Sequence, residues 1–236
     1  MRILIIFFLI VAFLDARDTI KGKKSSAVLA LTWHEAFCAT HKKYTECQPK
    51  WFFWYPKNGF VLHGLWPQPK NNLYCGVSKK DIGRDKNRQW HLLPEPHISK
   101  DLMKNLSEVM PSVEANLHRH QWIKHGVCYG KDAEVYFRDS INLANEFRNS
   151  LVAKKFDSKR GELVTIKEVG DWMDEAFGYG ARHRVNMICK NGFVSEIRLH
   201  LNSTSYGLHD GLRNTGKVIK SSCKKGRIQK GGFGWN

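Results

Sequence analysis

The chain has 236 residues, of which 42% are hydrophobic, and 38 Lys+Arg against 22 Asp+Glu give a formal net charge of +16. This composition excludes a wholly disordered chain, and the length suits one sizeable domain or at most two small ones. The positive charge favours an acidic partner such as nucleic acid, an anionic membrane surface or another polyanion; a basic protein whose charge serves only solubility is an equal alternative.

The N-terminus has the form of a secretory signal. Arg2 precedes a continuous apolar run, residues 3–14, and Ala16 offers a small residue for cleavage. The run is too short to span a bilayer comfortably. We therefore expect a signal peptide at 1–16, a flexible basic leader at 17–27 and a folded domain at 28–236, in a secreted or periplasmic protein without membrane contact after signal removal. A buried strand or an uncleaved anchor is the alternative.

Strands and helices follow in a mixed order. Apolar runs predict buried strands at 28–33 and 59–66, and four prolines mark 67–97 as rich in loops. Helical spacing begins at Ser99, a suitable cap, and Pro111 starts a second helix that runs to Gly126. We expect the longest helix at 133–154 and a shorter one at 165–177.

A hairpin is predicted near the C-terminus. Residues 184–189 and 193–201 read as strands, and Asn191-Gly192 between them is a strong turn signal. The chain shows no repeat and no internal linker. We therefore expect a single α+β domain, with helices packed against a central antiparallel sheet.

Six cysteines in an exported chain indicate disulfides rather than zinc ligands. No Cys-x-x-Cys pair is present, which disfavours a metal or redox centre. Cys38 and Cys47 are close enough in sequence to clip a local loop. The sequence alone does not choose among the possible pairings.

Two short strings carry most of the chemistry. They are His63-Gly64-Leu65-Trp66-Pro67 and the stretch from His120 to Cys128. If residues 113–125 are helical, one side of the helix carries two imidazoles, an amide and an ammonium, from His120, Gln121, Lys124 and His125. Such a face is costly to bury unless it meets an anion, although a solvated basic face is the simpler interpretation of the helix alone.

His63 changes that balance. It lies in an apolar strand between Leu62 and Leu65, where a charged imidazole is unfavourable without a partner. A core histidine is the usual explanation for such a residue. Paired imidazoles, however, can move protons near neutral pH while a lysine holds a phosphate.

The two strings together resemble the two active-site segments of the ribonuclease T(2) family, and residues 29–38 resemble its first strand. The resemblance implies that His125 is the general base for the ribose 2′-hydroxyl and His63 the general acid for the leaving 5′-oxygen. Lys124 would offset charge on the phosphorus, and His120 would hold the phosphate. The product would be a 2′,3′-cyclic phosphate.

Further expectations come from the same resemblance. Trp66 would stack on a base and Gln68 would bond its edge, although core packing and a solvated loop are the alternatives. The six cysteines would pair as Cys38–Cys47, Cys75–Cys128 and Cys189–Cys223. The enzyme would be a monomer that acts on RNA without a cofactor or metal, and DNA would resist because it lacks the 2′-hydroxyl.

Gln121 departs from the family pattern, in which glutamate is usual. An amide can donate a hydrogen bond to a phosphoryl oxygen, but it cannot ionise. It also removes an anion that would raise the pKa of nearby histidines. We therefore expect an active but slower enzyme with an altered pH profile.

Other functions were weighed. His118, His120 and His125 could supply three zinc ligands, but helical spacing turns His118 away from His120. A catalytically impaired RNA- or polyanion-binding protein is the second alternative, suggested by Gln121 and the basic C-terminal tail. A haem or redox protein is disfavoured because Cys-x-x-Cys-His is absent.

Overall fold

The protein is described by a computed structural model that covers residues 26–48, 59–205, 207–213 and 218–231. The predicted signal peptide lies outside the described residues, as does the leader up to residue 25. Ala27, which we assigned to the leader, already begins the first strand. The predicted single α+β architecture is confirmed.

One sheet organises the fold. β1 (Ala27–Trp33) pairs antiparallel with β2 (Phe60–Pro67) on one side and β5 (Phe193–Leu201) on the other, and β5 also pairs antiparallel with β4 (Val185–Lys190). The short strands β3 (Leu163–Thr165) and β6 (Lys225–Arg227) extend the sheet, with one parallel contact between β5 and β6. β1 and β2 confirm the two strands predicted from the apolar runs at 28–33 and 59–66.

The hairpin turn follows the predicted chemistry. Asn191 and Gly192 have φ of +51° and +80°. Positive φ at both central residues is the geometry that Asn-Gly turns favour in two-residue hairpins.

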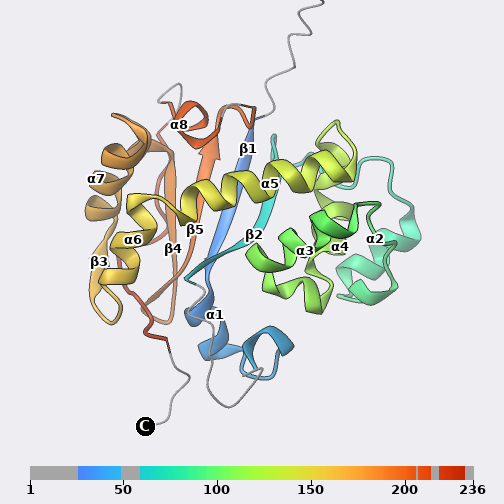
Figure 1. The fold of residues 1–236 in the computed structure, drawn as a ribbon, viewed down its shortest axis with the longest axis horizontal. Helices are drawn as coiled ribbons and strands as arrows, with labels where there is room; N and C mark the ends of the chain where they lie inside the picture. The colour runs from blue at the N-terminus through green and yellow to red at the C-terminus, as the bar shows by residue number, and fades with distance from the viewer. Residues whose placement is uncertain (1–25, 49–58, 206, 214–217, 232–236) are drawn as a thin grey trace, which may run out of the picture.

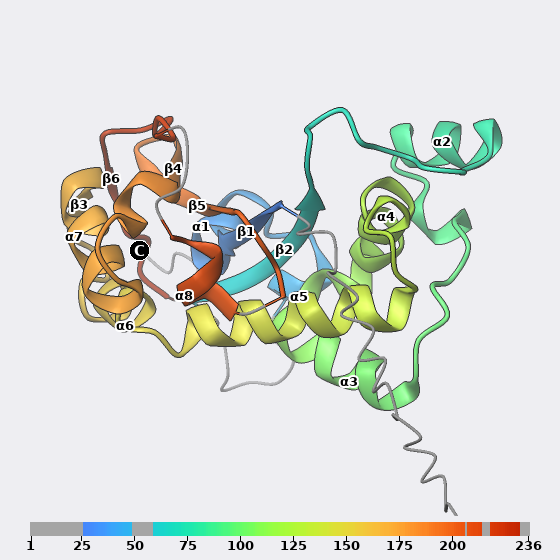
Figure 2. The ribbon, with the colours of Figure 1, turned by 90° about the horizontal axis from the view of Figure 1, so that it is seen from above.

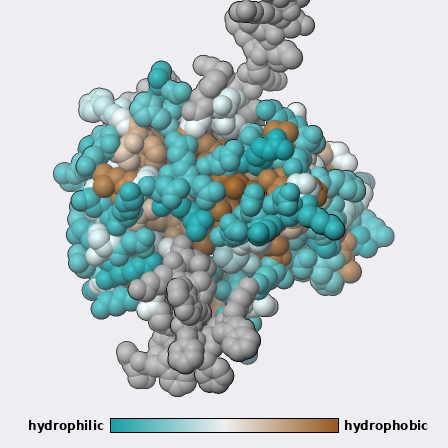
Figure 3. All heavy atoms as spheres, viewed as in Figure 1, coloured by the Kyte–Doolittle hydropathy of each residue, from teal (hydrophilic) through white to brown (hydrophobic). Residues whose placement is uncertain are grey.

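Helices cover one face of the sheet (Figure 1). α5 (Ala133–Arg148) crosses that face, and α6 (Leu151–Ser158) and α7 (Ile166–Phe177) continue the layer. The core lies between these layers and includes Leu29, Leu31, Ile197, Leu199, Phe137 and Phe147. Seen from the helix side, the surface is mostly hydrophilic, with hydrophobic residues visible between the polar ones (Figure 3).

A second group of helices lies beside β2 (Figures 1 and 2). The chain leaves β2, arches across to this group and returns through it to α5. Its members are α2 (Lys79–Lys86), η2 (Trp90–Leu92), α3 (Lys100–Val109), η3 (Pro111–Ala115), α4 (Leu117–Lys124) and η4 (Gly126–Cys128). Ser99 caps α3 as predicted, because its side chain accepts a hydrogen bond from the Leu102 N–H.

Two helix predictions were wrong in their extent. The helix predicted from Pro111 to Gly126 is divided, because Asn116 adopts a left-handed conformation between η3 and α4. The helix predicted at 133–154 ends at Arg148, and α6 starts after Ser150. Apolar spacing continues across both breaks, so periodicity alone did not reveal them. α7 agrees with the helix predicted at 165–177: it begins at Ile166, and Thr165 is its cap.

Smaller elements complete the described structure: α1 (His34–Thr40), η1 (Thr45–Cys47), η5 (Ala181–Arg184) and α8 (Gly207–Gly211). All three disulfides implied by the resemblance are present, at Cys38–Cys47, Cys75–Cys128 and Cys189–Cys223. Within the described ranges, no helix has both the length and the apolar composition needed to cross a membrane.

Candidate active site

A β-bulge positions His63 in β2. Ala30 of β1 pairs with Gly64 and Leu31 pairs with Leu62, so His63 is the extra residue on the bulged strand. Bulges interrupt the regular alternation of a strand and often redirect a side chain beside a functional site. The His63 side chain is 34% exposed, and its Nδ1 lies 2.7 Å from Oε2 of Glu196. An apolar strand therefore carries a histidine that is not enclosed in the core.

Glu196 is the partner that the sequence analysis did not find. It lies on β5 between core residues, and strand alternation directs its side chain to the sheet face opposite α5. Burial raises the pKa of the Glu196 carboxyl, but the hydrogen bond and charge of His63, together with the charge of Arg198, outweigh burial and lower it overall. An ionised carboxylate can only accept, so Nδ1 of His63 is the donor and Nε2 is left for the substrate side.

His120 is held from the helical side. Its Nδ1 lies 2.6 Å from Oδ1 of Asp85, the hydroxyl of Tyr74 donates to the other oxygen of Asp85 at 2.8 Å, and the Trp90 ring stacks on the imidazole at 4.7 Å. Burial raises the pKa of the Asp85 carboxyl, but the hydrogen bonds from His120 and Tyr74 lower it overall. The carboxylate therefore fixes the ring of His120 in one orientation.

His125 occupies a different environment. It follows the last residue of α4, is 8% exposed, and its Nδ1 has no hydrogen-bond partner among the described residues. Burial, followed by the charges of Lys124, His120 and His63, lowers the pKa of His125 to about 3, while the charge of Asp85 opposes this shift. The imidazole is consequently neutral and able to accept a proton at ordinary pH.

Trp66 connects the two histidines. Its ring centroid lies 5.3 Å from that of His63 in an edge contact and 5.5 Å from that of His125 in a stacked contact. The guanidinium of Arg198 also lies over the indole, 5.0 Å from its centroid. Residues 62 positions apart in sequence thus meet at one side chain, and Trp66 is already engaged by three neighbours.

Gln121 is buried, so the solvated basic face that we weighed as the simpler interpretation of this helix does not hold for this residue. It is 1% exposed, and its Oε1 accepts a hydrogen bond from Nε1 of Trp66 at 2.9 Å. A Cβ atom at Gly64 would approach Oε1 of Gln121 to 2.0 Å. Glycine at 64 is therefore required for the amide to reach Trp66.

The two remaining predicted residues lie beside this group. Lys124 is half-buried, and its charge acts on both His125 and Asp85. The Gln68 amide donates to the backbone carbonyl of Trp66 at 3.2 Å. Lys124 therefore belongs electrostatically to the site, whereas the Gln68 side chain is directed at its own chain.

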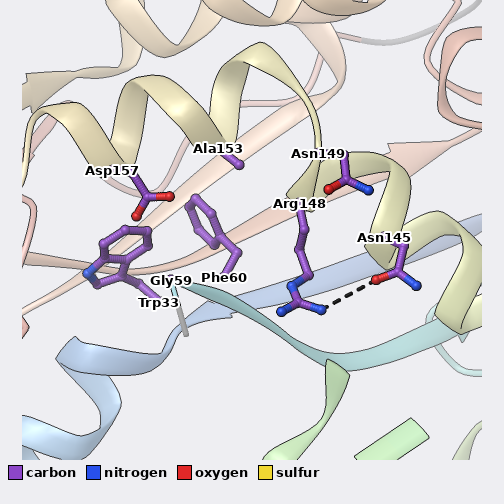
Figure 4. Close-up of a pocket in the computed structure, with 8 residues that line it drawn as sticks. All are labelled: Trp33, Gly59, Phe60, Asn145, Arg148, Asn149, Ala153 and Asp157. Carbon is purple, nitrogen blue, oxygen red and sulfur yellow. Dashed lines mark hydrogen bonds between the residues drawn. The ribbon is translucent and has the colours of Figure 1, made fainter. Parts of the chain in front are cut away.

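A cleft opens beside His63, between the sheet and the second group of helices. Its volume is about 410 Å³, and it is lined by residues that include Thr32, Phe37, His63, Trp90, Ser112 and Glu196. A smaller cavity of about 290 Å³ lies beneath α5 and α6 and contains Arg148 (Figure 4). None of the predicted catalytic residues lines this smaller cavity beneath α5 and α6.

The three histidines of the zinc alternative do not converge. Nε2 of His118 lies 2.8 Å from Oε1 of Glu95, whereas His120 contacts Asp85. In the part of the chain that the structure describes, the one close group of possible ligands is His34, Cys38 and Cys47, whose two sulfurs form a disulfide. The residues present do not fit the proposed zinc site.

Sequence reasoning missed the residues that hold the histidines: Asp85, Tyr74, Trp90 and Glu196. For Glu196 a signal existed, since Glu196, Arg198 and His200 alternate with apolar residues and so predict one polar face of a strand. No spacing linked that face to a histidine 133 positions away.

Comparisons with known proteins agree with this geometry. Residues 25–210 match the Ribonuclease T2 family. The chain is 24% identical over 197 residues to ribonuclease I of Escherichia coli, covering 74% of each chain, and 28% identical over 166 residues to ribonuclease Rh of Rhizopus niveus, covering 61% of this chain and 65% of that one.

Solved structures share the fold. The self-incompatibility associated SF11-RNase of Nicotiana alata has a TM-score of 0.57 at 17% identity, covering 88% of this chain and 100% of that one. A structure of RNase NT in complex with 5′-AMP has a TM-score of 0.53 at 16% identity, covering 87% of this chain and 98% of that one.

The fold and the paired histidines define an α+β enzyme equipped for acid–base chemistry. The chain belongs to the ribonuclease T2 family, and as a member of it the protein is an endoribonuclease.

Proposed function

We propose that the protein cleaves RNA by transesterification without a metal. The ribose 2′-oxygen attacks the adjacent phosphorus, the bond to the 5′-oxygen breaks, and a 2′,3′-cyclic phosphate forms, which water can open to a 3′-phosphate. The observation that carries the proposal is the contrast between His63 and His125, which contact the same tryptophan from opposite electrostatic environments.

His125 is the general base. A buried imidazole without a hydrogen-bonded carboxylate stays neutral, and neighbouring cations keep it so. A neutral ring can take the proton from the 2′-hydroxyl as that oxygen attacks. The scissile phosphate would lie between this ring and His63.

His63 is the general acid. The Glu196 carboxylate accepts a hydrogen bond from Nδ1 and fixes the ring, and Nε2 donates a proton to the departing 5′-oxygen. Glu196 does not reach the substrate in this scheme. It is a positioning residue that acts through His63.

Lys124 and His120 stabilise the phosphate. Both are cationic or hydrogen-bonding groups beside His125, and charge that grows on the phosphoryl oxygens in the transition state favours such neighbours. Asp85 holds His120 at 2.6 Å and so prepares it before substrate binds.

The leaving nucleotide would occupy the cleft beside His63, since the departing oxygen is on that side of the phosphate. Trp66 would contact the base on the other side once Arg198 moves off the indole, and Gln68 lies next to it in the chain. DNA would not be cut because it lacks the nucleophile. We also propose that the protein is a secreted or periplasmic monomer.

The test is an assay of chelator-treated protein on total RNA at low salt, with identification of the new ends. Cyclic or 3′-phosphate ends are expected, with 5′-hydroxyl partners. Ends carrying 5′-phosphates, or activity that the chelator abolishes, would overturn the scheme. Binding of RNA without any cleavage would favour the impaired binder that Gln121 suggests.

A further inference from the structure

A third cavity, the outer cavity, lies between α1 and the β4–β5 hairpin and adjoins the cleft beside His63. Its volume is about 370 Å³, and its lining includes Phe37, His41, Lys190, Phe193 and Ser195. It has no part in the scheme above. The lining combines aromatic rings with a lysine at its edge, the combination that single-stranded nucleic acids bind.

The two cavities share part of their walls. Phe37 and His41 line both, and their rings stack at 4.3 Å with an interplanar angle of 10°. The stacked pair thus forms the boundary between the cleft that contains His63 and the outer cavity. A strand leaving the first cavity meets this pair before it reaches the second.

A β-bulge in β5 builds the outer cavity. Ile188 of β4 pairs with Glu196 and Cys189 pairs with Val194, so Ser195 is the extra residue. The bulge reverses the alternation that follows it: Val194 is fully buried, while Ser195 and Phe193 line the cavity. The same strand therefore supplies Glu196 to the catalytic cleft and Phe193 to its neighbour.

The edge of the cavity carries charge of the right sign. Lys190 is exposed at the end of β4 and lines the cavity. An ammonium there can contact a phosphate while a base stacks on the rings behind it.

We propose that this cavity is an outer subsite for RNA, which binds the second nucleotide on the 3′ side of the scissile phosphate. Its base stacks on Phe193 and the Phe37–His41 pair, and its phosphate contacts Lys190. This inference rests on the proposed function, since His63 places the leaving nucleotide on this side of the site.

The test uses short substrates that contain a single ribose. A dinucleotide with one ribonucleotide at its 5′ end is compared with the same molecule extended by one deoxynucleotide at the 3′ end. The deoxyriboses confine cleavage to one bond. We expect the extension to raise kcat/KM by about tenfold, mainly through KM, and an abasic extension to give much less.

Two variants test the residues. In Phe193→Ala and Lys190→Ala the ratio of extended to short substrate falls towards one. Lys190→Ala removes an exposed side chain, so it keeps the test valid if Phe193→Ala fails to fold. Lys154→Ala, which removes an exposed lysine of α6, is the matched control and keeps the full ratio.

The inference is overturned if the abasic extension works as well as the complete one, or if both variants keep the full gain. Failure of the proposed function is a separate result, because the short substrate would then not be cleaved at all.

Discussion

On the sheet side of the site, Nδ1 of His63 contacts a buried carboxylate, whereas on the helix side His125 has no such contact within the described residues. Both rings touch Trp66. His63 therefore has a negatively charged neighbour, whereas His125 is buried and lies near positively charged groups. In the proposed scheme these identical side chains take opposite roles because their neighbours differ.

Removal of either imidazole should lower activity more than any other change considered. His63→Ala and His125→Ala should each lower kcat/KM for RNA by about 10²–10⁴-fold, the typical contribution of acid–base catalysis. Because the two rings serve one proton transfer sequence, the double variant should lose far less than the product of the two losses. Steady-state kinetics on a short substrate measures this.

His97→Ala is the control, since His97 lies exposed in a loop away from the cleft. Wild-type activity in His125→Ala, with unchanged circular dichroism, would contradict the assignment of the base.

Replacement of the Glu196 carboxylate tests its effect on His63. Glu196→Gln should lower kcat on the order of tenfold, less than loss of the imidazole itself, because His63 remains but loses its anionic partner. The loss should fall on kcat rather than on KM, because Glu196 contacts His63 and does not reach the substrate in this scheme.

The matched control is Glu95→Gln, which alters another carboxylate–histidine pair, Glu95–His118, outside the cleft. A purely structural role for Glu196 would predict lower stability without any selective loss of kcat.

A negative charge introduced at position 121 tests how the surroundings of His125 set its strength as a base. Gln121→Glu should raise turnover about two- to fivefold, because a carboxylate near His125 raises the pKa of that imidazole and strengthens the base. The acidic limb of the pH profile should move to higher pH. Gln121→Met removes the hydrogen bond to Trp66 without adding charge, so it separates the two effects. An unchanged or lower rate in Gln121→Glu would mean that the site has adapted to the amide.

The stability of the protein should reflect the same burial. The pKa of His125 is about 3 in the folded protein and near 6.5 when unfolded, so the unfolded chain binds the extra proton between these values. Stability therefore falls as pH drops from 6.5 towards 3, by about 2 kcal/mol at pH 5 from this group.

His125→Asn should remove that loss and raise Tm relative to wild type by about 5 °C more at pH 5 than at pH 7.5. His34 and His200, whose pKa burial lowers to about 4, leave part of the acid sensitivity in place. His97→Asn should follow the wild-type pH dependence. Equal Tm differences at both pH values would show that His125 is not held neutral by the fold.

Much of the fold was predictable because its signals are local. The apolar strands, the Ser99 cap and the Asn191-Gly192 turn each depend on a few adjacent residues. The break at Asn116 was not predicted, since a left-handed residue there leaves no mark on apolar spacing.

The proposed catalytic histidines were identified from two strings of the sequence, but their partners in the fold were not. Glu196 and Asp85 lie 133 and 35 positions from the rings they hold, and only the folded sheet and helices bring them together. The burial of Gln121 likewise depends on the absence of a side chain at Gly64 on another element. The residue types of the site could be identified from short stretches of sequence, whereas the orientation of their side chains depends on contacts between distant elements.

An NMR titration of the histidine rings in the free protein tests the central claim most directly, with His125→Asn used to assign the signals. We predict that the His125 ring remains neutral from pH 7 down to pH 5 and becomes protonated only near pH 3, and that Glu196→Gln moves the His63 signals but not those of His125. A His125 ring that takes up its proton near pH 6.5 would contradict the account.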